Sequence, residues 1–564
     1  MIKIEKDKLF MTAGETCYIV SASDGVLRAV YFGRRVEAED DLSALLGASN
    51  VPEFAPVVNG KKTEFALVGA EVLAEKPNCS GMHFAGGKTL KATVRSGSLT
   101  AEIYYTPYPR GGFSRQVVLV NGGGTSVTVG EPNNVRLRGE HTLTALDADG
   151  GVFSAAEVGK RSRCIDNFLA ISDGDGAYGF LCVYGDGAVC GKAAGGVTEI
   201  TCNGYGEITL KAGERYVAPE LLAVYSDNGI DGMSRVLHDI LRESLQKSSL
   251  SERKQVVLFC PTMSESKLVK AAGETVKLGC DVFAVDAGEV SVGTLGKLSE
   301  ACKAAGIKLG IKLSPFSIKK SSAAYNGKCV AAGERYTADI SVAEGAAAHY
   351  ATLEKLIKDN EIEYLMYDIP RGGLQKYAQG VHGVRSMLAT NFPELTVDWG
   401  IVPKKLRRGR LMCYPPSMMR VAAEPNGDGT LKQAFDEATV GCLSYWLDPL
   451  SLTDGMVRAV RAQVFSYQDD APAVMNGDLY IATSDDGDCC YISVTKDKSR
   501  AYVVCSRATG GETRVRLKGL DEHNLYNVRE LGATFSGAAL RSCGVILPDA
   551  PTCCLHVRQV ADYE

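Results

Sequence analysis

The sequence predicts a chain of several domains: an N-terminal β-sandwich, a central barrel of alternating strands and helices, and a small C-terminal β sandwich. Three observations predict this order. At 564 residues the chain is too long for a single hydrophobic core. Short apolar runs separated by turn residues fill positions 1–235, whereas strand-like and helix-like runs alternate over 255–470. Strand-like runs alone return over 475–564.

The first domain, residues 1–235, consists of short runs rich in β-branched and aromatic residues. Many strands without a helical pattern over such a length indicate a large β-sandwich. Residues 185–192 contain glycines and a lysine, but their spacing differs from that of a phosphate-binding loop and no helix follows, so we interpret them as a turn. The clearest strand-like runs are 17–20, 27–32, 99–105, 115–120 and 178–184.

The pattern changes at residues 233–241, which open an amphipathic helix, and we place a helical linker at 236–254. Beyond it, strands and helices alternate, which predicts a parallel sheet covered on both faces and hence a (β/α)8-type barrel. Because about 215 residues is close to the lower limit for eight units, we expect one unit to be curtailed. The predicted strands are 255–259, 282–286, 308–313, 337–340, a strand ending at Asp368, 395–399 and 440–446, and the predicted helices are 264–278, 295–305, 342–359, 374–390 and 454–467.

The last domain is predicted from runs at 480–483, 490–494, 502–505, 513–517 and 553–557.

Eighteen cysteines are scattered along the chain without a CxxC pair, which indicates reduced thiols in a cytoplasmic protein and no zinc site. No metal or other cofactor is expected.

Charge and hydropathy argue against two classes of partner. The net charge of -5 and a single dense basic run, 404–410, without interleaved aromatic residues argue against nucleic acid. No stretch approaches the roughly 18 apolar residues of a membrane span. The first ten residues mix charges into the chain and lack the apolar core of a signal peptide.

The strongest candidate for chemistry is Asp368. It follows the apolar run 364–367 and precedes residues that must turn the chain, as at the end of a buried parallel strand. Side chains at the C-terminal strand ends of such a barrel converge on one site, so an acid there indicates catalysis. The alternative is that Asp368 only caps the next helix or pairs with Arg371.

The chain resembles glycoside hydrolase family 36, the α-galactosidase or melibiase family, over nearly its whole length. The resemblance rests on the order and spacing of several short pieces rather than on any single one. In the first domain these are 25–33 (GVLRAVYFG), 138–140 (RGE), 211–220 (KAGERYVAPE), 225–229 (YSDNG) and 232–234 (GMS). In the barrel they are 278–286 (LGCDVFAVD), 364–371 (YLMYDIPR), 414–419 (YPPSMM) and 443–448 (LSYWLD).

The resemblance implies a retaining glycosidase that acts on an α-galactoside. Such enzymes place two carboxyl groups ~5–5.5 Å apart, one as nucleophile and one as acid and base. Asp368 stands where the family's KWDxNR-like strand carries its nucleophile, and a neighbouring cation such as Arg371 would favour its ionised form. Relatives also assemble into oligomers, so the resemblance implies a homo-oligomer that binds a carbohydrate.

Several family motifs are altered here. The paired-acid and tryptophan motif that grips the sugar reads VDAGE, which leaves Asp286 and Glu289 as candidate substrate contacts. Where the family has a tryptophan and an acid-rich strand end, this chain has Lys312. The segment that bears the family's general acid is missing from the interval between residues 395 and 414.

The general acid must therefore come from elsewhere. We predict Asp398, because the adjacent Trp399 would stack on a sugar and dry the site enough to raise a carboxyl pKa. The alternative for Asp398 is a loop residue near the basic run. Tyr414 and Arg371 complete the predicted substrate contacts. Weaker candidates are Glu424 and Asp448, better interpreted as cap or ion-pair residues, and His349 and His382, better interpreted as surface or core histidines.

Two other functions stay open at this point. The first is a degenerate relative that binds carbohydrate without turnover, or a glycosidase with altered sugar specificity. The second is an unrelated barrel enzyme such as an aldolase, in which Lys312 would form a Schiff base. An ordinary solvated lysine is the simpler interpretation of Lys312.

Overall fold

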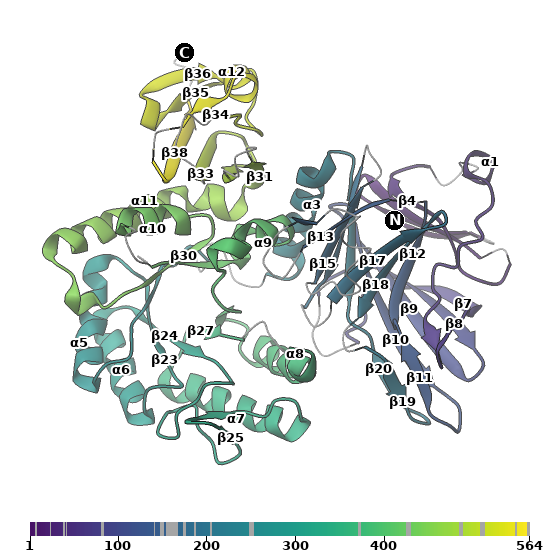
Figure 1. Cartoon of the computed structure of the whole chain (residues 1–564), viewed down its shortest axis with the longest axis horizontal. Helices are drawn as coiled ribbons and strands as arrows, with labels where there is room; N and C mark the ends of the chain where they lie inside the picture. Colours follow the sequence, from purple (N-terminus) through teal and green to yellow (C-terminus); the bar gives the residue numbers. More distant parts are fainter. Residues whose placement is uncertain are drawn as a thin grey trace. The chain divides into compact units, whose positions relative to one another are not determined.

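The structure is a computed structural model of the chain, and Figure 1 shows its helices and strands. It describes residues 1–564 except 6–7, 23, 38–39, 41, 80–83, 140, 147–151, 154–166, 173–175, 185–187, 204–205, 247–252, 370–373, 425–429, 484–488, 508–513, 548–549 and 561–564. The chain divides into two compact units. The first comprises 1–245, 373–386 and 405–414, and the second comprises 246–372, 387–404 and 415–564.

The first unit is built from antiparallel sheets. A long sheet has the strand order β14-β13-β15-β16-β21-β10-β9-β8-β7, and smaller sheets have the orders β1-β2-β3-β4, β19-β11-β5-β6 and β12-β18-β17. The described strands are β1 (Ile2–Glu5), β2 (Lys8–Ala13), β3 (Thr16–Ser21), β4 (Arg28–Arg34), β5 (Val57–Val58), β6 (Lys61–Lys62), β7 (Ala66–Leu73), β8 (Thr89–Ser96), β9 (Leu99–Tyr108), β10 (Gly112–Asn121), β11 (Val127–Gly130), β12 (Asn133–Arg138), β13 (Thr142–Leu146), β14 (Val152–Phe153), β15 (Phe168–Ser172), β16 (Ala177–Cys182), β17 (Ala188–Ala194), β18 (Val197–Asn203), β19 (Ile208–Leu210), β20 (Arg215–Val217) and β21 (Leu221–Ser226). The helices in this unit include α1 (Leu42–Leu46), α3 (Gly229–Ser244) and α9 (Arg407–Cys413).

Aromatic side chains fill the core between these sheets, and one buried acid is paired inside it. Glu53 accepts hydrogen bonds from the hydroxyls of Tyr18 and Tyr105, each at 2.8 Å, and pairs with Arg115 at 3.0 Å. A buried charge is tolerated only when it is paired and hydrogen-bonded, so this cluster is structural. The antiparallel sheets agree with the strand-rich pattern predicted for this part of the chain. Residues 188–192 of the predicted turn belong to strand β17 instead.

The second unit contains a curled sheet of seven parallel strands in the order β28-β27-β24-β23-β22-β30-β29. Helices lie along its outer side in Figure 1. The strands are β22 (Val257–Phe259), β23 (Val282–Asp286), β24 (Lys308–Leu313), β27 (Tyr364–Tyr367), β28 (Thr396–Asp398), β29 (Arg420–Ala423) and β30 (Cys442–Trp446). The helices are α5 (Glu265–Thr275), α6 (Val292–Ala305), α7 (Ala343–Asn360), α10 (Leu431–Ala438) and α11 (Asp454–Asn476), with 3-10 turns η1 (Val276–Leu278), η3 (Pro416–Met418) and η4 (Pro449–Ser451). Helix α8 (Leu374–Asn391) is divided between the two units.

The two edges of the curled sheet approach each other. A parallel bridge joins Ile401, just beyond β28, to Arg420 of β29. The interior is lined by alternate residues of the strands, among them Val282 and Ala284 of β23 and Tyr364 of β27. Gly310 faces this interior, where a Cβ atom would lie only 2.9 Å from the Tyr364 ring, so the glycine makes room for that ring. The curled sheet is therefore a partial barrel.

Two local predictions for this unit were wrong. Residues 338–340 are not a strand, and Thr337 is the last residue of β26 (Arg335–Thr337), which pairs with β25 (Val330–Ala332) in a small hairpin. Strand β29 was not predicted, and it supplies the seventh strand of the sheet.

The C-terminal part of the second unit is a six-stranded antiparallel sheet of order β31-β32-β33-β38-β35-β36, with a short pair β34-β37. These strands are β31 (Asp478–Thr483), β32 (Cys489–Val494), β33 (Arg500–Ser506), β34 (Arg514–Val515), β35 (Leu525–Val528), β36 (Ala533–Ser536), β37 (Val545–Ile546) and β38 (Thr552–Gln559), with η5 (Arg529–Leu531) and α12 (Gly537–Ser542) between them.

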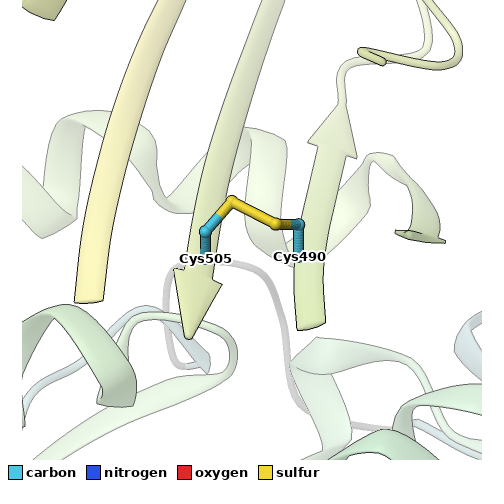
Figure 2. Close-up of a disulfide and its surroundings, with 2 residues drawn as sticks. All are labelled: Cys490 and Cys505. Atoms are coloured by element: carbon cyan, nitrogen blue, oxygen red, sulfur yellow. A yellow bond between two sulfur atoms is a disulfide. The ribbon is translucent and has the colours of Figure 1, made fainter. Parts of the chain in front are cut away.

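The expectation that all thiols are reduced was wrong. Cys490 of β32 and Cys505 of β33 face each other in register and form a disulfide, which Figure 2 shows. Within the described part of the chain, no helix combines the length and the apolar character that crossing a membrane requires.

His556 of β38 makes the stability of this unit depend on pH. Its ring lies 3.0 Å from Asp470 of α11 and 2.6 Å from Glu530 of η5. Burial alone would lower the pKa of His556, but the two carboxylates outweigh it and raise the pKa to about 9. A folded-state pKa above the unfolded value of 6.5 stabilises the fold fully below about pH 6.5, and that stabilisation is lost as pH rises through 9.

We therefore expect the free energy of unfolding to fall between pH 6.5 and 9.5 in the native protein, and to fall less in His556→Gln. Urea denaturation at several pH values measures this difference. Equal pH dependence in the two proteins would contradict the assignment.

Candidate active site

Three polar side chains meet at the C-terminal ends of neighbouring parallel strands. Asp286 ends β23, Lys312 lies near the end of β24, and Asp368 directly follows β27. The alternation of side chains along each strand explains their direction. Because Val282 and Ala284 face the interior, Asp286 does too, and Asp368 continues the interior series of Tyr364 and Met366.

Lys312 lies between the two carboxylates. Its Nζ atom is 3.5 Å from Oδ2 of Asp286 and 3.3 Å from Oδ2 of Asp368. These two oxygens can therefore be no further apart than the sum of the two distances, 6.8 Å. The same ammonium group lies 5.3 Å from the centre of the Trp446 ring, at the end of β30. The site thus combines two carboxylates, one cation and one aromatic face.

Both carboxylates are open to solvent. The side chain of Asp368 is 37% exposed and that of Asp286 is 30% exposed, whereas Lys312 is more enclosed at 19%. A cluster with this exposure is accessible to a ligand, unlike a fully buried ion pair.

The loop after β23 holds Asp286 in place. The backbone N–H of Gly288 donates to Oδ1 of Asp286 at 2.8 Å. A Cβ atom at Gly288 would lie 2.7 Å from the carbonyl oxygen of Ser317 and 3.1 Å from Oδ1 of Asp286, so only glycine fits without a backbone shift. Burial raises the pKa of Asp286, although the charge of Lys312 opposes that rise.

Asp398 does not fit the predicted role of general acid. Its carboxylate is 2% exposed and accepts hydrogen bonds at 2.8 Å from Arg253 and from Arg420. The hydroxyl of Tyr364 donates to it as well, at 2.8 Å. Burial would raise the pKa of Asp398, but the two guanidinium groups hold it well below its usual range. A carboxylate that stays ionised between two arginines has no proton to give, so this prediction is corrected.

The register of the strands explains why Asp368 is exposed whereas Asp398 is buried. Asp398 pairs with Met366 on β27, two residues before Asp368. A two-residue offset is roughly 6–7 Å along a strand, which places Asp398 deeper in the sheet interior than Asp368. There it connects β28 to Arg420 on β29 and helps to hold the two edges of the curled sheet together.

The other predicted contacts are placed as follows. Trp399 is 40% exposed and its ring meets that of Tyr367 edge-on at 5.8 Å, while its neighbour Gly400 lies against Asp368. Glu289 is paired with Lys319 at 2.6 Å and with Arg335. Tyr414 belongs to the other compact unit, where Asn167 donates to its hydroxyl at 2.5 Å. Arg371 lies outside the described residues.

The weaker candidates behave mostly as structural residues. Asp448 caps the turn η4 by accepting a hydrogen bond from the N–H of Leu450 at 2.8 Å. His349 is a core residue, and burial lowers its pKa to about 4. The ring of His382 packs edge-on against Tyr184 at 5.3 Å. Glu424 is exposed just after β29.

Sequence reasoning missed three residues that shape the site. Trp446 was available as the last residue of a predicted strand, but its strand neighbours were not known. Arg253 and Arg420 had no signal, because only the fold brings them to Asp398.

Comparison with known proteins finds similarity to one family of glycosidases. The family model described as the glycosyl hydrolase family 36 C-terminal domain matches residues 488–564. The curated relatives extend the match into the rest of the chain. α-Galactosidase Mel36A of Lactobacillus acidophilus is 23% identical over 505 residues, covering 70% of this chain and 68% of its own length. These matches support a place for the chain in glycosyl hydrolase family 36, from which its sequence has diverged.

Further relatives and solved structures show the same similarity. α-Galactosidase AgaA of Geobacillus stearothermophilus is 23% identical over 60% of this chain and 59% of its own length, so the match spans less than two thirds of that relative. Among solved structures, the galactosidase domain of the α-galactosidase-sucrose kinase AgaSK superposes with a TM-score of 0.83 at 17% identity, covering 99% of this chain and 100% of that one. At this identity the superposition shows a shared fold. The named α-galactosidase relatives support a glycosidase.

Proposed function

We propose that the chain is a retaining glycosidase of the α-galactosidase type, with Asp368 as its nucleophile. The observation that carries this proposal is the position of Asp368. It is an exposed carboxylate at the C-terminal end of an interior strand, within 3.3 Å of a lysine and beside a second carboxylate. Catalytic side chains of parallel barrels come from this end of the strands, and retaining glycosidases need two carboxyl groups close together.

The chemistry follows from the groups present. A carboxylate oxygen of Asp368 attacks the anomeric carbon, and the bond to the leaving oxygen breaks to give a covalent glycosyl-enzyme. Water then attacks the same carbon and releases Asp368. Two displacements at one carbon retain its configuration. The ring of Trp446 offers an apolar face of the kind that stacks on a sugar, and Lys312 offers a donor for a hydroxyl group.

The relatives support an α-galactoside as substrate. Two variants of AgaA have been solved with raffinose and with stachyose, and the chain shares their fold with TM-scores of 0.80. In the same proposal the curled sheet acts as the catalytic barrel, within the domains 1–235, 236–254, 255–470 and 475–564. Arg371, Trp399, Glu289 and Tyr414 stay proposed substrate contacts. A homo-oligomer and a cytoplasmic location also stay predictions.

One observation favours a second candidate, a relative that binds carbohydrate without turnover. Asp398, the predicted acid, is locked between Arg253 and Arg420 and offers no proton. A site that lacks an acid altogether would still bind a sugar between Lys312 and Trp446.

The stereochemistry of the first product separates these candidates. We expect the protein to hydrolyse raffinose or an aryl α-galactoside and to release α-galactose first, as followed by proton NMR before mutarotation. Initial release of β-galactose would contradict the double displacement. Binding of raffinose by calorimetry without hydrolysis of either substrate would favour the second candidate.

A further inference from the structure

We propose that Asp286 is the acid and base partner of Asp368, and thus a second catalytic residue of this site. In this role it would protonate the leaving oxygen in the first step and deprotonate water in the second. The inference rests on the proposed function, because it assigns a role only if Asp368 forms a covalent intermediate.

The geometry supports this pairing. Asp286 and Asp368 contact the same Lys312 ammonium, and their nearer oxygens are at most 6.8 Å apart. That limit includes the ~5–5.5 Å separation that retaining glycosidases use. Both side chains project from the ends of interior strands and both are partly exposed, so a sugar can reach them from the same side. The sequence predicted Asp286 only as a contact to the sugar. Its distance from Asp368 supports the additional role of acid and base.

The surroundings of Asp286 suit a group that must carry a proton. Burial raises its pKa, and the charge of Glu289 on the same loop raises it further. Lys312, on β24, and the hydrogen bond from the N–H of Gly288 oppose both effects, and the net direction of the pKa is upward. Glu289 is itself paired with Lys319 and Arg335, which limits its influence. Gly288 fixes one oxygen of Asp286, so the carboxyl group is held in one orientation.

The other acids at this end of the sheet are less suitable. Asp398 is locked in the buried cluster with Arg253 and Arg420. Asp448 is used as a cap. Among the acids that the structure describes here, Glu424, exposed just after β29, is the remaining rival, so it belongs in the test.

The two steps balance as follows. An electron pair on Asp368 forms the bond to the anomeric carbon while the bond to the leaving oxygen breaks, and that oxygen takes its proton from Asp286. Asp286 is then a carboxylate. It takes a proton from water as the water oxygen attacks the anomeric carbon, and the bond to Asp368 breaks with its electron pair. Both residues return to their starting protonation states, and the net reaction consumes one water.

The test compares two substrates in Asp286→Ala. Raffinose needs protonation of its leaving oxygen, whereas α-galactosyl fluoride does not. We expect kcat/KM for raffinose to fall by roughly 10²–10⁴-fold, and kcat/KM for the fluoride to change by less than about tenfold. Added azide should raise kcat with the fluoride and give α-galactosyl azide, because azide attacks the intermediate without needing a base.

Asp281→Asn is a matched control. Asp281 lies just before the same strand, at its opposite end, and burial raises its pKa as well. Its substitution should leave the ratio of the two kcat/KM values unchanged. Asp286→Asn, which keeps the size of the side chain, repeats the test if Asp286→Ala unfolds.

Each other outcome overturns the inference. An equal loss for both substrates without azide rescue would make Asp286 a sugar contact only. The leaving-group pattern in Glu424→Ala instead would assign the role to Glu424. Neither of these results contradicts the proposed function. In both cases the native protein would still be active, and Asp368→Ala would still abolish that activity. A native protein that hydrolyses neither substrate would overturn both.

Discussion

Replacing Asp368 by alanine is expected to lower kcat/KM for an aryl α-galactoside by roughly 10³–10⁶-fold, the range seen when an enzyme loses its nucleophile. Without the carboxylate no covalent intermediate forms, and only substrate binding by the remaining groups persists. Azide is expected to restore part of the rate by occupying the space of the lost carboxylate. Because azide then attacks in a single displacement, the product should be β-galactosyl azide, of inverted configuration.

The opposite configurations of the two azide products distinguish the roles of Asp368 and Asp286. Asp368→Asn serves as a second variant that keeps the side-chain volume, and thermal melting confirms that each variant is folded. Activity of Asp368→Ala within about tenfold of the native protein would contradict the nucleophile assignment.

Among the substitutions proposed, Asp398→Ala is expected to lower the free energy of unfolding the most. Asp398→Ala removes the carboxylate that pairs with Arg253 and Arg420, while both guanidinium groups stay charged in the buried interior. Breaking a buried ion pair by removing one partner costs about 3–5 kcal/mol. Because the pKa of Asp398 is lowered in the folded protein, its contribution to the free energy of unfolding is fully present at pH values above the usual pKa of an aspartate. This contribution is lost only as the pH falls through the lowered pKa of the folded state. Urea denaturation of the native protein and Asp398→Ala measures the difference.

A surface ion pair provides the control for this measurement. Lys303 and Glu361 lie 2.6 Å apart with side chains 54% and 67% exposed, and Lys303→Ala should cost less than about 1 kcal/mol. Equal effects for Asp398→Ala and Lys303→Ala would show that the buried cluster is not what holds the sheet edges together.

The elements with strong periodicity were predictable from the sequence. Strands β23 and β24 have the predicted bounds, because each is a short apolar run between helix-like segments. Strand β29 was missed because four residues, Arg420–Ala423, include a charge and carry little pattern. Helix α11 continues well past its predicted end to Asn476, with Pro472 inside it.

The site was predictable in part. The rule that strand ends converge singled out Asp368, and resemblance to family motifs singled out Asp286 and Lys312. In the structure the Lys312 ammonium contacts both carboxylates. The strand-end rule failed for Asp398 because it does not give the strand register. Asp398 pairs with Met366, two residues before Asp368, and this offset separates the buried carboxylate of Asp398 from the exposed carboxylate of Asp368.

The disulfide shows the same limit. Cys490 and Cys505 are joined because β32 and β33 pair with these residues opposite each other. Cysteine spacing alone does not give that register. What the sequence lacks in each case is the pairing of one element with another.

The most direct test of the central claim is to trap the intermediate on Asp368. The native protein would be treated with an activated α-galactosyl fluorosugar that forms the intermediate faster than it hydrolyses, and then digested for peptide mass spectrometry. We expect a single glycosylated peptide, with the sugar attached to Asp368 and absent when raffinose competes. A label on any other carboxylate, or no label in a protein that turns over an α-galactoside, would contradict Asp368 as the nucleophile.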